Sequence, residues 1–131
     1  MLYTRKGDAG TTKVFGCDMR ISKSSELPEV LGALDELNSF IGLCKVHARQ
    51  VQDSGVKIGR KTLSTSDILR EVQENLFIIQ AEVAGAPKKI GKTKVTRIEK
   101  IVDTIEKEIP PIKSFSIAGG TELAALLDVA R

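Results

Sequence analysis

Cysteine and histidine are scarce in this chain, and their scarcity excludes several kinds of site. The 131 residues include 2 Cys and 1 His. Cys17 and Cys44 lie too far apart for a Cys-x-x-Cys redox motif, and no second pair exists to build a zinc site. A single histidine, His47, leaves almost no material for a His-based metal site or a Ser-His-Asp triad. We therefore expect two reduced thiols with Cys44 in the core, no metal ligands, and a solvent-facing His47 without a role.

Aromatic residues and long apolar runs are scarce too. Four Phe, one Tyr and no Trp are thin material for base stacking, and no recognised nucleic-acid motif is present. No apolar run is long enough to span a bilayer, and the N-terminus lacks the apolar core of a secretory signal. We expect no nucleic-acid partner, no membrane partner and a cytoplasmic location.

The remaining composition is that of one ordinary globular domain over residues 1–131. Hydrophobic residues make up 41% and charged residues 28%. The net charge of +3 sits near the N-terminus, because residues 1–23 carry five basic and two acidic side chains, and five minus two equals the whole excess. Such a segment suits a small polyanion, although a solvated basic arm is the simpler alternative. The charged residues of this segment are Arg5, Lys6, Lys13, Arg20 and Lys23 against Asp8 and Asp18.

Four segments carry apolar residues at steps of three and four, which indicates helices. We expect the first over Pro28–Ala48 and the second from a cap at Ser66–Asp67. The third follows Thr93 or Thr96, and the fourth begins with Thr121 as its N-cap. The expected core positions are Val30, Leu34, Leu37, Ile41, Cys44 and Ala48 in the first helix, Leu69, Val72, Leu76, Ile79 and Val83 in the second, and Val95, Ile98, Val102, Ile105 and Ile109 in the third.

No period-two pattern of comparable length competes with these helices. The sequence therefore predicts an all-α fold, a helical bundle over residues 28–131. An irregular arm of about 25 residues, 1–25, precedes it, and residues 52–65 read as a mobile polar loop between helices.

The arm contains a glycine- and threonine-rich stretch, Tyr3–Thr12. Glycines let backbone N–H groups approach an anion, and neighbouring hydroxyls and basic side chains add donors and charge. The stretch suits a triphosphate, while a plain Gly-Asp-x-Gly turn remains the alternative.

One stripe of the first helix combines polar and small residues beside the main apolar seam. Asp35, Asn38 and Gly42 share it with Leu31, so we expect partial burial and a need for polar partners. Arg131 shares an apolar face of the last helix, and an Asp35–Arg131 pair would satisfy both residues. Such a pair could simply tie two helices together, or it could also hold a binding loop in shape.

Several blocks of the sequence, taken in order, resemble the PduO-type ATP:cob(I)alamin adenosyltransferases. Together they cover nearly the whole chain apart from residues 52–65, which makes the match more specific than any single motif. The blocks are Tyr3–Thr12, Arg20–Lys23, Leu31–Asn38, Gln73–Phe77, Phe115–Ala125 and Val129–Arg131.

This resemblance implies a homotrimer of ferritin-like, up-and-down helical bundles with active sites between subunits. Asp35 and Arg131 match the family's interface pair, and Asp35, Asn38 and Phe115 are the residues implied for cobalamin. Phe115 matches the apolar residue that blocks the lower face of the cobalt, so Phe115, Asp35 and Arg131 form the implied catalytic set. The arm is implied to wrap ATP with Mg²⁺ through Thr4, Arg5, Lys6, Gly7, Asp8, Gly10, Thr11, Thr12 and Lys23.

The implied reaction needs no general base. Cob(I)alamin is itself a strong nucleophile that attacks the ribose 5′-carbon of ATP and expels triphosphate, so the protein aligns the reactants and neutralises the leaving group. A reductase would supply cob(I)alamin, and an adenosylcobalamin-dependent enzyme would use the product. A carrier that binds ATP and cobalamin without turnover, an inactive shortened form, and a ligand-free structural bundle are the alternatives.

The sequence departs from the family in two places. Ala118 stands where the family usually has proline before the Gly-Gly pair. The family's last helix also continues past Arg131 into an Arg- and Glu-bearing stretch that contacts ATP, so here the last helix is expected to be cut short.

Overall fold

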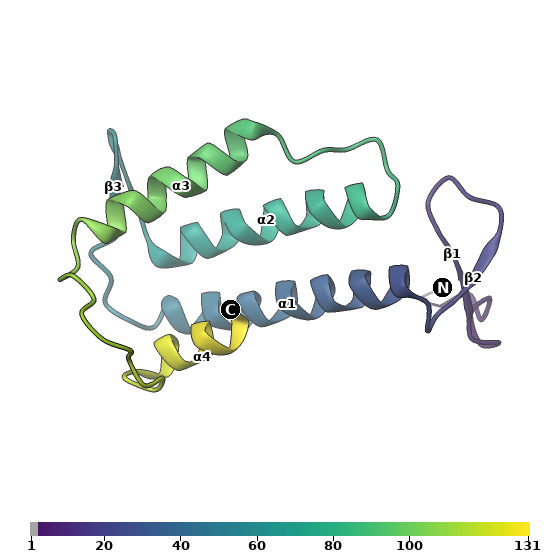
Figure 1. Cartoon of the computed structure of the whole chain (residues 1–131), viewed down its shortest axis with the longest axis horizontal. Coiled ribbons are helices and arrows are strands. Elements are labelled where there is room, and N and C mark those ends of the chain that lie inside the picture. Colours follow the sequence, from purple (N-terminus) through teal and green to yellow (C-terminus); the bar gives the residue numbers. More distant parts are fainter. Residues whose placement is uncertain (1–2) are drawn as a thin grey trace.

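Four helices run alternately up and down in the computed structural model, which describes residues 3–131 (Figure 1). They are α1 (Glu26–Ala48), α2 (Thr65–Val83), α3 (Lys92–Glu106) and the short α4 (Glu122–Ala130). The predicted all-α bundle is confirmed. The first two residues of the predicted arm, Met1 and Leu2, lie outside the described residues.

The predicted start is correct for α4 and wrong by a few residues for α2 and α3. Thr121 caps α4 as expected, its hydroxyl accepting from the Ala124 N–H. The expected start of α2 is late by two residues, because Ser64 and Asp67 form a reciprocal capping box there. The expected start of α3 is late as well, since Gly91 precedes its first residue without a side-chain cap.

The core is the contact between α1 and α2. Ile41, Cys44 and Ala48 of α1 are buried against Leu69 and Leu76 of α2, and Cys44 is fully enclosed. Burial also raises the pKa of the Cys44 thiol, because the thiolate would lose its hydration. The predicted positions of these two seams and the buried Cys44 are therefore confirmed, while Val30 and Val83 at the helix ends are exposed and were predicted wrongly.

The predicted seam of α3 is wrong in most of its members. Ile101, which the prediction left out, is the buried residue, whereas Val95, Val102, Ile105 and Ile109 are exposed. The reason is that α3 meets its neighbours along a narrow strip. Strand β3 lies against it, and a cavity of about 250 Å³ separates part of it from α2.

The N-terminal arm is not irregular throughout. Strands β1 (Thr11–Lys13) and β2 (Arg20–Ser22) pair antiparallel, with Thr12 opposite Ile21. Two three-residue strands are too short to show a period-two pattern, so the sequence alone did not reveal them. The hairpin fixes the C-terminal end of the glycine- and threonine-rich stretch Tyr3–Thr12.

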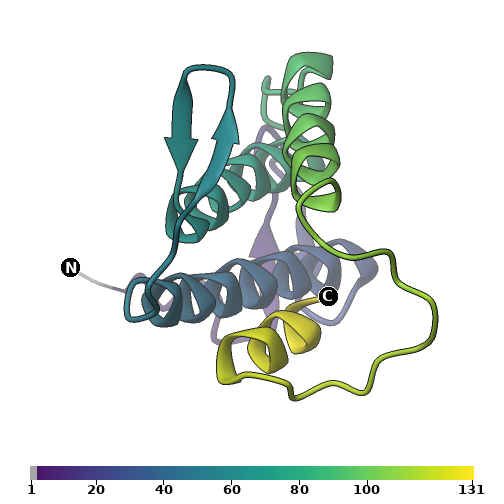
Figure 2. The same cartoon turned by 90° about the vertical axis from the view of Figure 1, so that its left-hand side faces the viewer.

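Residues 52–65 also form a hairpin where a mobile loop was predicted. Strands β3 (Val56–Ile58) and β4 (Lys61–Leu63) pair with Ile58 opposite Lys61, and the hairpin projects beside α3 (Figure 2). The two-residue turn between them has Gly59 at φ +62°, the position where a type II′ turn needs glycine.

Asp53 joins this hairpin to α2. Its carboxylate accepts hydrogen bonds from the backbone N–H of Thr65, at the first turn of α2, and from that of Gly55 at 2.7 Å. The Thr65 N–H and then the Gly55 N–H hold the pKa of the Asp53 carboxyl below its usual range.

None of the helices in the described part of the chain, residues 3–131, has the length and apolar character that a membrane span requires.

We predict that Asp53→Ala lowers the free energy of unfolding by about 1 kcal/mol at neutral pH, the usual cost of a lost N-terminal helix contact. Because the native pKa is lowered, the contribution is present above the unfolded pKa and is lost as the pH falls through the native one. Urea denaturation of both proteins at neutral and acidic pH measures this.

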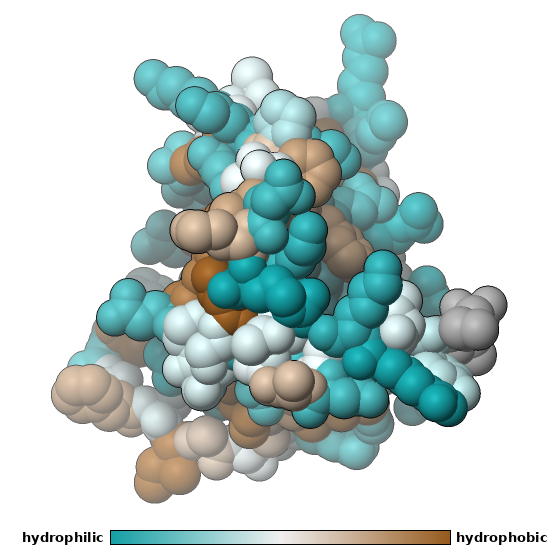
Figure 3. Space-filling model, turned by 90° about the vertical axis from the view of Figure 1, so that its right-hand side faces the viewer, coloured by the Kyte–Doolittle hydropathy of each residue, from teal (hydrophilic) through white to brown (hydrophobic). Residues whose placement is uncertain are grey.

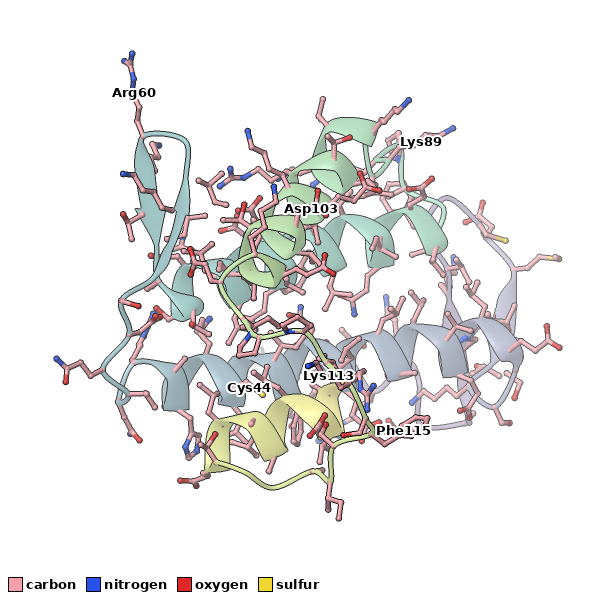
Figure 4. The ribbon with its side chains drawn as sticks, turned by 60° about the vertical axis from the view of Figure 1, so that its left-hand side comes forward. Cys44, Arg60, Lys89, Asp103, Lys113 and Phe115 are labelled. Carbon is pink, nitrogen blue, oxygen red and sulfur yellow. The ribbon has the colours of Figure 1, made fainter. Side chains whose placement is uncertain are left out.

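Asp103→Ala is the matched control, because Asp103 is an exposed carboxylate on α3 (Figure 4). It should change stability little at either pH. A difference between wild type and Asp53→Ala that stayed the same in acid would contradict the role assigned to Asp53.

Candidate functional site

The glycine-rich stretch of the arm forms a compact loop ahead of β1. Two backbone turns overlap in it: the Asp8 N–H donates to the Arg5 carbonyl at 3.4 Å, and the Gly10 N–H to the Gly7 carbonyl at 3.1 Å. Arg5 itself has φ 57°, a conformation that costs a non-glycine residue free energy. The loop therefore has an unusual shape, and its turns are closed by one long and one ordinary backbone hydrogen bond.

Lys23 lies directly over this loop. Its backbone N–H donates to the Gly10 carbonyl at 2.9 Å, which extends the pairing of β1 with β2 by one residue. A Cβ at Gly7 would stand 3.0 Å from the Lys23 ammonium nitrogen and 3.3 Å from the Thr11 carbonyl oxygen. Gly7 is thus the position at which the chain passes beneath the lysine, and the predicted residues Gly7, Gly10 and Lys23 are brought together.

Arg20 is the residue of this site that sequence reasoning missed. From β2 its guanidinium donates to the Thr11 hydroxyl and the Thr11 carbonyl, each at 2.8 Å, and to the Lys6 carbonyl. The signals were its place among the basic residues of residues 1–23 and in a block shared with the family, but its contacts depend on the register of β1 and β2.

The other predicted residues of the arm lie on the same loop and strand. Arg5 donates to the Tyr3 hydroxyl at 3.1 Å and lies over its ring at 5.1 Å, while Thr4, Lys6 and Asp8 are exposed. Thr11 and Thr12 are half-buried in β1. The end of the molecule that carries the arm is covered mainly by hydrophilic side chains with small hydrophobic areas between them (Figure 3).

A pocket of about 400 Å³ separates the arm from the bundle. Its walls combine the apolar side of the hairpin with the first turns of α1 and the end of α2, and Lys23 stands on its rim. The pocket lining is Thr12, Lys13, Val14, Phe15, Ile21, Lys23, Leu27, Pro28, Leu31 and Ala84.

The polar stripe of α1 is buried at Asn38 but exposed at Asp35, where partial burial was predicted for both. Asn38 is buried, with 4% of its surface exposed, and its side-chain oxygen accepts no hydrogen bond from the described residues. Gln73 of α2 donates to the Asn38 carbonyl at 2.9 Å and accepts from the Lys45 ammonium at 2.5 Å. A Cβ at Gly42 would lie 3.1 Å from the Gln73 amide nitrogen, so this glycine makes room for the polar bridge between the helices.

Asp35 departs from the prediction, because it is exposed rather than buried. Arg131 is exposed as well, with 85% of its side chain accessible, and its ion pair within the described chain is with Asp128 at 3.7 Å. The expectation that burial forces these two residues together is therefore wrong for one chain, since each reaches solvent.

Phe115 is fully exposed on the segment 107–121 that joins α3 to α4 (Figure 4). This segment stands away from the helices as an open loop (Figure 2). Along the longest axis of the molecule it lies at the end opposite to the arm (Figure 1). One chain therefore does not bring Phe115 to the loop at Arg5–Gly10.

His47 is not fully solvent-facing, because 27% of its side chain is exposed and its Nδ1 lies 3.6 Å from the Glu122 carboxylate. The contact joins the end of α1 to the start of α4. Within residues 3–131, no three His, Cys, Asp or Glu side chains gather closely enough to hold a metal ion.

Comparison with known proteins decides the family. The sequence model described as Cobalamin adenosyltransferase matches residues 2–131. The chain belongs to this family. Among its relatives, the corrinoid adenosyltransferase PduO of Citrobacter freundii is 34% identical over 99% of this chain and 37% of that protein. A second corrinoid adenosyltransferase of the same organism is 33% identical over 99% of this chain and 70% of that protein.

Solved structures show the same adenosyltransferase fold. A variant PduO-type ATP:corrinoid adenosyltransferase from Lactobacillus reuteri, complexed with cobalamin and ATP, matches with a TM-score of 0.80 at 28% identity, covering 99% of this chain and 70% of that one. A second variant from that organism, complexed with ATP, matches with a TM-score of 0.79 at 29% identity over 98% and 69%.

Two glycines of α1 predict opposite effects of the same substitution in this adenosyltransferase chain. Gly42→Ala should lower the free energy of unfolding, because the added methyl displaces the Gln73 amide and loosens its bridge to Asn38 and Lys45. Gly32→Ala should raise it by about 0.5–1 kcal/mol, since nothing lies within 4 Å and alanine favours the helix.

Chemical denaturation of the two variants beside wild type measures both effects. If Gly42→Ala were stabilising to the same degree as Gly32→Ala, the close approach of Gln73 to α1 would be wrong.

Proposed function

We propose that this chain transfers the 5′-deoxyadenosyl group of ATP to the cobalt of cob(I)alamin, giving adenosylcobalamin and triphosphate. Its membership of the cobalamin adenosyltransferase family supports this, as do the PduO-type relatives complexed with cobalamin and ATP. The observation that carries it is the arm: Lys23 and Arg20 lie within contact of a turn-forming Gly/Thr loop, which suits a polyphosphate.

The arm stabilises charge on the triphosphate as it leaves. Backbone N–H groups of the loop, the hydroxyls of Thr4, Thr11 and Thr12, and the cations of Arg5, Lys6 and Lys23 are donors of the kind that preorganised anion sites use. Because all of them are fixed to one short segment, little reorganisation is required when negative charge develops.

Mg²⁺ enters with ATP, and the donor set of the arm is compatible with it. Magnesium is held mainly by phosphate oxygens and water, with one or two carboxylates. The exposed carboxylate of Asp8, placed between Gly7 and Gly10, is the residue of the arm that would contact the ion. The bound ion would neutralise charge on the phosphates.

The reaction at cobalt requires that the reactants are aligned and that an axial ligand is excluded, and it requires no proton transfer. Cob(I)alamin attacks the 5′-carbon of ATP, the carbon–oxygen bond to the triphosphate breaks, and that oxygen leaves with the bonding electrons. Phe115 covers the lower face of the cobalt and keeps an axial ligand away, which makes the cobalt easier to reduce. Its fully exposed ring supports this role, since the ring is free to be buried against a ligand.

The active site lies between subunits of a homotrimer in this proposal. Asp35 and Arg131 are both exposed in the single chain, so each is available to pair across an interface, and Asn38 lies one helical turn from Asp35 on α1. The distant positions of the arm and of segment 107–121, which carries Phe115, support the same arrangement (Figure 1). The unpaired Cys17 and Cys44 fit a cytoplasmic, reducing compartment. A cobalamin reductase and an adenosylcobalamin-dependent enzyme would act before and after this step.

The test is an anaerobic assay with chemically reduced cobalamin and Mg-ATP. The visible spectrum should show cob(I)alamin consumed and adenosylcobalamin formed faster than without protein, with triphosphate released in equal amount. Asp35→Ala and Arg131→Ala should each slow the reaction by about tenfold or more, because each leaves an interface charge unpaired.

Asp103→Ala, which removes a carboxylate from the exposed side of α3, is the control and should keep the wild-type rate. If Mg-ATP raised the melting temperature but no triphosphate were released, the chain would be a carrier that binds ATP without turnover, and the proposed enzyme activity would be wrong.

A further inference from the structure

We propose that Arg20 is a positioning residue for ATP, which holds the loop over Lys6–Thr11 in shape and does not itself bind the phosphates. This inference rests on the proposed function, because it assigns how the nucleotide arm is kept ready.

The loop has little else to hold it. Its two turn hydrogen bonds are 3.4 and 3.1 Å long, all its residues from Arg5 to Gly10 except the half-buried Gly7 are exposed, and Arg5 stands at φ 57°. Exposed turns with few hydrogen bonds and a strained residue sample other conformations unless something fixes them. A loop of that kind would lose conformational entropy on binding ATP, at a cost in affinity.

Arg20 fixes the loop at both ends. One guanidinium nitrogen donates to the Lys6 carbonyl inside the first turn and also to the Thr11 carbonyl after the second turn, at 2.8 Å to Thr11, while Nε donates to the Thr11 hydroxyl at 2.8 Å. The guanidinium therefore links Lys6 to Thr11 from outside the loop, and its planar fork holds these donors in fixed relative directions, whereas the donors of an ammonium rotate.

The contacts also set the direction of a backbone donor. The described peptide bonds are all trans, so the N–H of Gly7 points opposite to the Lys6 carbonyl in the same peptide plane. Because that carbonyl faces Arg20, the Gly7 N–H faces away from it. Arg20 thus donates three hydrogen bonds to oxygens of the loop. The backbone N–H of Gly7 and the ammonium of Lys23, which lies over Gly7, are left to bind the anion.

Arg20→Lys separates this role from simple charge, because it keeps the cation and loses the fork. Isothermal titration with Mg-ATP, and with inorganic triphosphate as a second probe, should show both dissociation constants raised about tenfold in Arg20→Lys and in Arg20→Ala. Lys13→Ala is the matched control: it removes a cation from the same hairpin whose ammonium pairs with Asp18 at 3.2 Å. Its affinity should fall less than threefold. The melting temperature of the ligand-free variants should stay near that of wild type, because the arm lies outside the core.

Amide spectra of the ligand-free protein test the mechanism without ATP. The Gly7 and Gly10 resonances should shift, and their hydrogen exchange should accelerate, in both Arg20 variants and not in Lys13→Ala. Wild-type affinity in Arg20→Lys would overturn the proposal in favour of charge alone. Weakened ATP binding with unchanged ligand-free resonances would overturn it in favour of a direct phosphate contact. If wild type bound no ATP, the proposed function would fail, while the ligand-free spectra would still decide whether Arg20 holds the loop.

Discussion

The close packing of α1 on α2 is the constraint on which the rest of the structure depends. At its centre are Cys44, with no exposed surface, and the small side chain of Ala48, which let Leu69 and Leu76 of the facing helix pack deeply. Close-packed protein interiors tolerate little change in volume. The arm is attached where α1 begins, the β3–β4 hairpin joins the far ends of the pair, and α4 lies along α1 (Figure 1). Each functional segment is therefore positioned by this one helix pair.

This arrangement explains why one chain divides the chemistry between its two ends. The loop proposed to bind the phosphates stands at the N-terminal end of α1, while Phe115 stands on the loop that leads into α4 (Figures 1 and 4). Adenosyl transfer requires the ribose carbon of ATP and the cobalt to be in contact. The exposed positions of Asp35 and Arg131 also favour a site shared between subunits, because two opposite charges that are unpaired with each other in one chain can pair across an interface. Apolar residues of α3 such as Val102 are exposed in the single chain too.

Much of the fold was predictable because long amphipathic helices have a strong periodic signal. The seams through Ile41 and Leu76, the burial of Asn38 and the Thr121 cap follow from spacing and capping chemistry within the helix itself. The two hairpins were missed because three-residue strands are too short for a period to be seen. The burial of Ile101 in place of Val102 was missed because periodicity marks an apolar face and does not say which part of it meets a neighbour.

The site was predictable to the extent that its residues adjoin in sequence. Gly7, Gly10 and Lys23 come together because a short hairpin brings them there, and the family resemblance pointed to the same stretch. Arg20 was missed because a guanidinium's partners depend on strand register, which no local pattern reports. The exposure of Asp35 was missed because spacing treats every stripe beside a seam as covered by the same chain.

Subunit complementation tests most directly whether the site is shared. An arm variant (Arg5→Ala with Lys23→Ala) and Phe115→Ala are each expected to lose most of the activity alone. After subunit exchange, about one interface in four of a randomly mixed ring carries both an intact arm and an intact Phe115. The account predicts that the mixture recovers about a quarter of the wild-type rate. A mixture whose subunits have exchanged, as mass spectrometry would show, and whose rate stays at the mean of the two variants would contradict it.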